Sequence, residues 1–143
     1  MNLTIVGTGY VGLVTGACFA EFGYSVTCVD KDSKRLEMLK SGKCPFFEPG
    51  MDELLDKHIN KTKLISFAST IKNNLENTDI IFITVGTPTR RFEDEADLSF
   101  VWQVAEEIAE NINKYCLVVT KSTVPVGTTR EVKKIISNKI DQK

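Results

Sequence analysis

TIVGTGYVGLVTG, residues 4–16, starts as an apolar run and continues with glycines at positions 7, 9 and 12. In a GxGxxG sequence between a strand and a helix, the first glycine permits a tight turn, the second leaves room for a pyrophosphate, and the third allows close packing. The N–H groups at the start of the helix then face the anion without any basic side chain. Gly7, Gly9 and Gly12 therefore predict a diphosphate seat, although glycine-rich turns also arise from close packing alone.

Asp30 supports the dinucleotide interpretation. It follows the apolar run SVTCV, about 20 residues beyond the glycines, where a carboxylate can accept hydrogen bonds from both ribose hydroxyls. A carboxylate also repels a 2′-phosphate, so the sequence predicts NAD as the cofactor in preference to NADP. Arg35 keeps an alternative open, because an arginine can serve a phosphate, lie along the adenine or pair with an acid.

The rest of the chain alternates β-branched apolar runs with segments of helical period, which is typical of βαβ units. We expect strands over residues 3–6, 25–29, 64–67, 80–85 and 115–120, and a polar loop over 86–96. We expect helices around residues 11–22, 33–41, 51–59, 71–75, 98–112 and 128–136. Val11, Cys18 and Phe22 should lie on the apolar stripe of the first helix, and Thr128 should cap the last. The order predicts one α/β domain over residues 1–143, a Rossmann-type doubly wound, mainly parallel sheet with helices on both faces.

Two further loops leave the carboxyl ends of predicted strands, where open α/β sheets bind ligands. They read VGTPT (residues 85–89) and TKSTVPVGT (residues 120–128). Thr87, Ser122 and Thr123 offer short hydroxyls that can reach a ribose or a reacting group. The alternative is that these hydroxyls only cap helices and close turns.

Five segments occur together: GTGYVGLVTGACFAEFGYSVTCVD, FFEPGMDELL, DIIFITVGTPT, ADLSFV and TKSTVPVGTT. In order and spacing they resemble the NAD-binding domain of the UDP-glucose/GDP-mannose dehydrogenase family, over nearly the whole chain. The resemblance implies that Thr123 helps to hold a catalytic water at the reacting centre. It implies cofactor binding by residues of the glycine turn, the end of the second strand and the two later loops: Gly7, Thr8, Gly9, Tyr10, Val11, Gly12, Asp30, Arg35, Val85, Gly86, Thr87, Pro88, Ser122 and Thr123.

The family oxidises the primary alcohol of a nucleotide sugar to a carboxylate with two NAD, through a thioester on a cysteine. That cysteine and its helper lysine and aspartate belong to later domains, and none of the four cysteines here matches it. The resemblance therefore implies NAD binding without turnover by this chain alone, and a UDP-sugar substrate and a possible homo-oligomer for the intact enzyme. UDP-glucose is the nearest likeness. GDP-mannose, UDP-N-acetylmannosamine and a stand-alone dinucleotide sensor remain alternatives.

The composition gives little support to other partners. A net charge of -1 offers no positive field for nucleic acid or an anionic membrane, and no apolar run is long enough for a membrane span. The cysteines show no metal-ligand spacing, so we expect no metal site, reduced thiols and a cytoplasmic protein. Cys18 and Cys28 should be buried, whereas His58, the only histidine, should be solvated.

Overall fold

The computed structural model describes residues 1–89 and 96–141, and in this part of the chain five parallel strands form one sheet. Their order is β3-β2-β1-β4-β5. The strands are β1 (Asn2–Val6), β2 (Ser25–Val29), β3 (Ile65–Ala68), β4 (Ile80–Ile83) and β5 (Leu117–Thr120). The helices are α1 (Tyr10–Glu21), α2 (Ser33–Lys40), α3 (Met51–Asp56), the π-helical turn η1 (Lys57–Lys61), α4 (Ser99–Asn111) and α5 (Thr128–Ile140). The Rossmann-type α/β fold expected from the sequence is confirmed.

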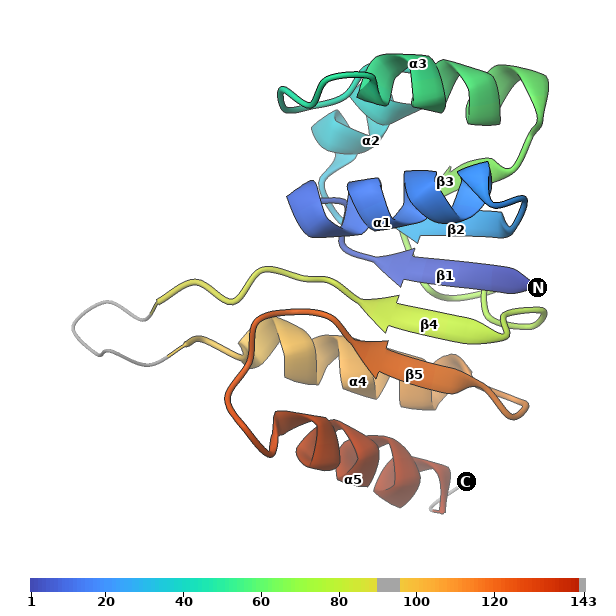
Figure 1. Ribbon diagram of the computed structural model, residues 1–143. Coiled ribbons are helices and arrows are strands. Elements are labelled where there is room, and N and C mark those ends of the chain that lie inside the picture. Colours follow the sequence, from blue (N-terminus) through green and yellow to red (C-terminus); the bar gives the residue numbers. More distant parts are fainter. Residues whose placement is uncertain (90–95, 142–143) are drawn as a thin grey trace.

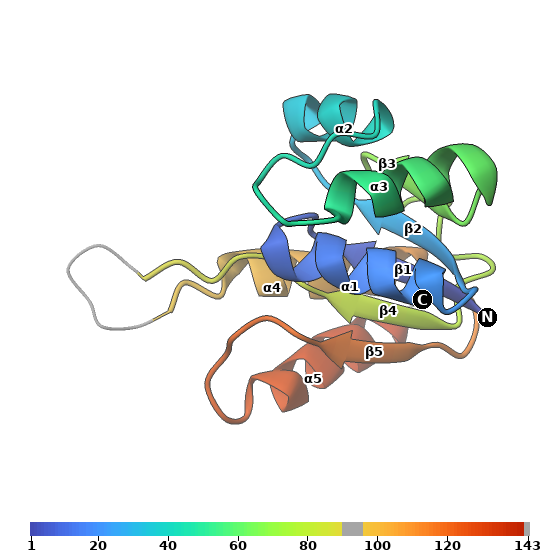
Figure 2. The same ribbon diagram turned by 45° about the horizontal axis from the view of Figure 1, so that its top comes forward.

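Helices cover both faces of the sheet, with α1 and α3 on one side and α4 on the other (Figure 1). Ile5 and Cys28 point into the core beneath α1, where Leu13 meets them. Ile83 belongs to a second core, in which Ile108 of α4 lies. Because all the strands are parallel, their carboxyl ends share one edge, and the glycine turn lies at the same edge as the loops after β4 and β5 (Figure 2).

The prediction that Val11, Cys18 and Phe22 lie on a buried apolar stripe of α1 is wrong. Val11 is 46% exposed, Phe22 is 75% exposed and Cys18 is also exposed. The buried face consists mostly of small residues: Gly12, Leu13, Gly16, Ala17 and Ala20. The reason is the close approach of the helix to the sheet, since a methyl group at Gly16 would lie 3.0 Å from the Cys28 sulfur.

Two other local expectations differ from the structure. Residues 71–75 form turns instead of a helix, although Ile71 and Leu75 are buried as their apolar character requires. At the start of α5 the N-cap is Gly127, and the Thr128 hydroxyl donates to the carbonyl of Pro125, so no capping box forms. The loop expected over residues 86–96 includes 90–95, which lie outside the described residues.

His58 is buried, which contradicts the expectation of a solvated residue. Its side chain, which belongs to the π-helical turn η1, is only 2% exposed. Nε2 lies 2.7 Å from a carboxylate oxygen of Glu21, and Nδ1 lies 3.0 Å from the Thr62 hydroxyl. Lys57 also donates to Glu21, so the end of α1 is tied to the segment after α3. Both ring nitrogens thus have partners, as a buried imidazole requires.

Candidate functional site

The three glycines of the turn after β1 have different surroundings. Gly7 has a φ of +100°, and a Cβ there would lie 2.9 Å from the carbonyl oxygen of Thr84. A Cβ at Gly12 would lie 1.9 Å from the Gly7 carbonyl oxygen, which no side-chain movement can relieve. At Gly9 no heavy atom of the described residues, apart from Gly9 and its two chain neighbours, lies within 4 Å of the added carbon. The turn therefore has no room for a side chain at Gly7 and Gly12 but has free space at Gly9. Binding of a diphosphate by the backbone requires this arrangement.

Helix α1 begins directly at this opening. Gly9 is its N-cap, no side chain caps it, and its first turn carries no acidic residue. The first N–H groups of a helix have no intrahelical acceptor, so they present a partial positive charge to an anion. Tyr10 stands beside this opening, where its ring lies 4.9 Å from that of Phe46 and its hydroxyl donates to Glu48.

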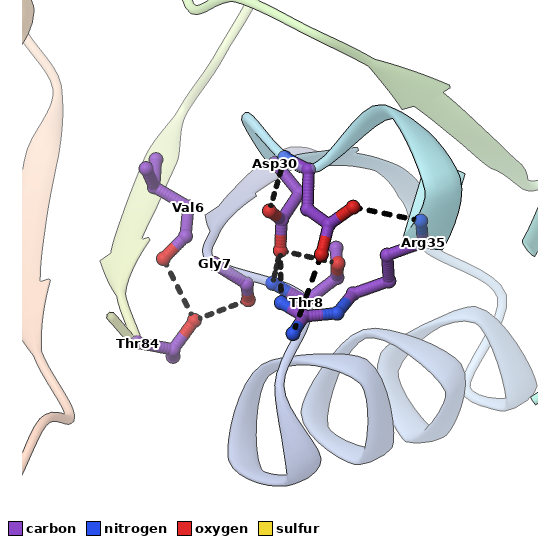
Figure 3. A network of polar contacts seen from close by, with 7 residues as sticks. Val6, Gly7, Thr8, Asp30, Arg35 and Thr84 are labelled. Atoms are coloured by element: carbon purple, nitrogen blue, oxygen red, sulfur yellow. Dashed lines mark hydrogen bonds and ion pairs between the residues drawn. The ribbon is translucent and has the colours of Figure 1, made fainter. Parts of the chain in front are cut away.

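Asp30 is held in place by a network of hydrogen bonds (Figure 3). Its Oδ2 accepts from the backbone N–H of Thr8 at 2.7 Å, from the Thr8 hydroxyl at 2.6 Å and from Arg35 Nη1 at 3.0 Å. Among the residues that the structure describes, its Oδ1 accepts only from the backbone N–H of Asp32, at 3.0 Å. Because a carboxylate has about four lone-pair sites, Oδ1 keeps capacity for a further donor.

The same contacts set the ionisation of Asp30. Burial raises the pKa of this carboxyl, but hydrogen bonds from Thr8, Asp32 and Arg35 outweigh it, so the pKa is lowered overall. The carboxylate is therefore charged at neutral pH. Thr8 was expected here only as part of the glycine motif, because its partner Asp30 lies 22 residues away and no local pattern indicates their hydrogen bond.

A cavity of about 760 Å³ opens at this edge of the sheet. It is lined by six of the residues expected from the sequence: Gly7, Gly9, Asp30, Arg35, Val85 and Gly86. The other eight are not among the residues that line it in the described part of the chain: Thr8, Tyr10, Val11, Gly12, Thr87, Pro88, Ser122 and Thr123. The far wall is formed by α4, whose Phe100, Gln103 and Glu107 the sequence analysis missed. Their helical spacing of three and four residues was visible in the sequence.

The loops after β4 and β5 are joined to each other by hydroxyl groups. The Thr87 hydroxyl donates to the carbonyl of Thr123 at 2.8 Å, and the Ser122 hydroxyl donates to the carbonyl of Val85 at 2.7 Å. Thr123 itself is exposed. Two of the three hydroxyls singled out in the sequence are thus committed to backbone carbonyls, and they fix the shape of the loop pair.

No cluster of side chains suited to a metal ion occurs among residues 1–89 and 96–141. Within the same residues, no helix has both the length and the apolar character needed to cross a membrane.

The sequence profile described as "UDP-glucose/GDP-mannose dehydrogenase family, NAD binding domain" matches residues 1–143. This chain belongs to that family. A UDP-glucose 6-dehydrogenase of Rhizobium meliloti is 50% identical over 136 residues, which are 95% of this chain and 31% of that protein. The chain therefore spans about a third of the length of this relative.

Two solved structures of the family show the same architecture. A GDP-mannose dehydrogenase of Pseudomonas aeruginosa superposes with a TM-score of 0.92 at 33% identity, over 100% of this chain and 33% of that one. A UDP-glucose dehydrogenase of Pyrobaculum islandicum superposes with a TM-score of 0.90 at 34% identity, over 97% of this chain and 33% of that one.

The residues of the site are suited to binding NAD, the cofactor of the UDP-glucose/GDP-mannose dehydrogenase family. The space at Gly9 faces the uncapped start of α1, where a diphosphate meets N–H groups. Asp30 lines the cavity at the end of β2 with a free acceptor site, as a ribose-binding carboxylate should. The cavity volume is also in the range of small-molecule sites.

Proposed function

We propose that this chain is the NAD-binding part of a UDP-glucose 6-dehydrogenase. The observation that carries the proposal is the contrast within the glycine turn, which is closed at Gly7 and Gly12 and open at Gly9. Close packing alone would account for the first and third glycines, but it gives no reason for a glycine facing empty space. Together with Asp30 at the end of β2, the open position supports the binding of a dinucleotide.

Each residue has a defined part in this proposal. The N–H groups at the start of α1 bind the diphosphate, and Asp30 accepts from the adenosine ribose. Arg35 and the backbone at Val85 and Gly86 line the same cavity. When bound, NAD supplies an acceptor for the hydride of the substrate alcohol. Thr8 orients Asp30 through its hydroxyl.

The remaining residues expected from the family belong to the proposal as well. We assign Tyr10, Val11 and Gly12 to the helix start that faces the diphosphate. We assign Thr87, Pro88 and Ser122 to the nicotinamide side, and Thr123 to the positioning of a catalytic water. The hydrogen bonds between the two loops support this by fixing the backbone there.

The sugar is assigned from the relatives. Identity of 50% to a UDP-glucose 6-dehydrogenase favours UDP-glucose as the sugar. No cysteine is among the described residues that line the cavity. We therefore propose that this chain binds NAD without turning substrate over. In the proposal the whole enzyme, a possible homo-oligomer, oxidises the sugar to a carboxylate with two NAD. The four free thiols support a reducing compartment, the cytoplasm.

Calorimetric titration of the purified chain with NAD and NADP tests the proposal. We expect NAD to bind and NADP to bind at least about tenfold more weakly. Gly9→Ala should weaken NAD binding by about tenfold or more, since its methyl group occupies the diphosphate seat. Its unfolding free energy should change by no more than about 1 kcal/mol, the usual range for an N-cap exchange. Absence of NAD binding, or a preference for NADP, would overturn the assignment.

A further inference from the structure

Three basic side chains line the cavity, Lys31, Arg35 and Lys72, and the first two follow β2 closely. Lys31 and Arg35 are both held by carboxylates. Arg35 contacts Asp30 at 3.0 Å and Asp32 at 3.9 Å. Lys31 donates from Nζ to Oε1 of Glu107 at 2.5 Å, so an ion pair connects the end of β2 to α4 on the far wall of the cavity.

The position of these cations matters for the choice of dinucleotide. The carboxylate of Asp30 marks the place of the adenosine ribose, and a basic side chain beside that place is what accommodates a 2′-phosphate. The side chain of Lys31 is long and 59% exposed, so it could reach such a phosphate if nothing restrained it. Glu107 is 26% exposed and is therefore the more buried member of the pair.

We infer that Glu107 determines cofactor specificity by holding Lys31 in an ion pair and withholding it from a 2′-phosphate. Glu107 acts through Lys31 and is thus a positioning residue. The inference rests on the proposed NAD site. It explains how this domain keeps two cations beside the ribose carboxylate and still presents no free positive charge from them to NADP.

The chain offers a matched control on the same helix. Glu110 also lines the cavity, but it bonds to Lys139 of α5 at 2.6 Å. Glu110→Gln removes one negative charge from the same wall without releasing Lys31. A difference between Glu107→Gln and Glu110→Gln therefore separates the release of this lysine from a general change in charge.

The experiment is calorimetry of NAD and NADP binding to the wild-type chain and its variants at low salt. We expect Glu107→Gln to bind NADP about fivefold more tightly, with NAD affinity within about twofold, because one charged contact to the phosphate becomes available. Glu110→Gln should change either affinity by less than about twofold. Adding Lys31→Gln to Glu107→Gln should restore the wild-type ratio of affinities. The gain should fade at high salt, which screens an exposed contact.

Three results would overturn the inference. Equal gains in Glu107→Gln and Glu110→Gln would assign the effect to total charge. Tight NADP binding that survives Lys31→Gln would exclude the lysine as the phosphate partner. An unchanged affinity ratio in Glu107→Gln, with a wild-type urea midpoint, would show that the ion pair does not restrain Lys31. If Glu107→Gln unfolds, Glu107→Asp carries the same test. Wild-type protein that binds neither dinucleotide would instead refute the proposed function.

Discussion

The carboxyl ends of β1 and β2 and those of β4 and β5 lie at the same edge of the sheet but are built in different ways. At the first pair, backbone N–H groups at Gly9 and the carboxylate of Asp30 face a cavity. At the second pair, the hydroxyls of Thr87 and Ser122 bond to carbonyls of the neighbouring loop, and Thr123 is exposed. The first region thus opens onto the cavity with a helix start and a carboxylate, whereas the second reaches the cavity only near Val85 and Gly86 and exposes Thr123 to solvent.

The largest effect is expected from Gly12→Ala, which disrupts the packing of the glycine turn at the carboxyl end of β1. The added methyl group would lie 1.9 Å from the Gly7 carbonyl and 2.5 Å from the Thr84 hydroxyl, which itself donates to the Val6 and Gly7 carbonyls (Figure 3). We expect a loss of about 3 kcal/mol in unfolding free energy and no NAD binding, because overpacked sites force the backbone to move. Urea denaturation measures the first and calorimetry the second. Wild-type stability would mean that α1 can shift away from β1.

Asp30→Asn keeps the shape of the side chain and removes its charge. NAD affinity should fall by about tenfold to a hundredfold, since hydrogen bonds to a charged acceptor contribute about 1.5–3 kcal/mol. The preference for NAD over NADP should shrink with it. Calorimetry with both dinucleotides measures the change. An unaltered NAD affinity would remove Asp30 from the ribose site, and with it the difference between the two regions.

The pH dependence of stability sharpens the same region. The folded-state pKa of Asp30 lies below its ordinary value of 3.8, so its ionised form stabilises the fold. This contribution is fully present above about pH 4 and is lost as the pH falls through the lowered pKa. The urea midpoints of wild type and Asp30→Asn should therefore differ by a constant amount from about pH 7 to pH 5 and converge in more acidic solution. A gap that widens with acid would contradict the hydrogen-bond network seen here.

The smallest effect is expected from Thr123→Ala in the second region. Thr123 is exposed, and its backbone carbonyl accepts a hydrogen bond from the Thr87 hydroxyl. NAD affinity and the urea midpoint of this chain should both stay within error, as for most surface substitutions, which change stability by less than about 0.5 kcal/mol. A clear loss of NAD affinity would show that the second region contributes to binding on its own.

The sequence predicted the strands well because β-branched apolar runs bounded by turn residues seldom form anything other than strands. For example, β2 has its predicted bounds, residues 25–29. It mispredicted the buried face of α1, because a helix that approaches strands closely buries glycine and alanine in place of large side chains. His58 was mispredicted for a related reason. Its partner Glu21 lies 37 residues away, and no local pattern indicates a contact of that kind.

In the site, the places of the glycines and of Asp30 could be predicted, because the turn after β1 and the end of β2 follow from local pattern and spacing. The far wall could not be assigned in the same way. Glu107 reaches the cavity only through the packing of α4 behind the sheet, and its partner Lys31 is 76 residues away. Such contacts depend on the order of the strands in the sheet, which cannot be obtained from a single sequence.

Tyr10 is a spectroscopic probe at the N-terminus of α1. The hydrogen bond to Glu48 raises the pKa of this phenol, so its ultraviolet phenolate band emerges at more alkaline pH than that of an ordinary tyrosine. An anion seated at the adjacent N–H groups would add negative charge and delay the band further. A comparison of alkaline difference spectra between the wild-type chain and Tyr10→Phe thus separates this band from those of Tyr24 and Tyr115.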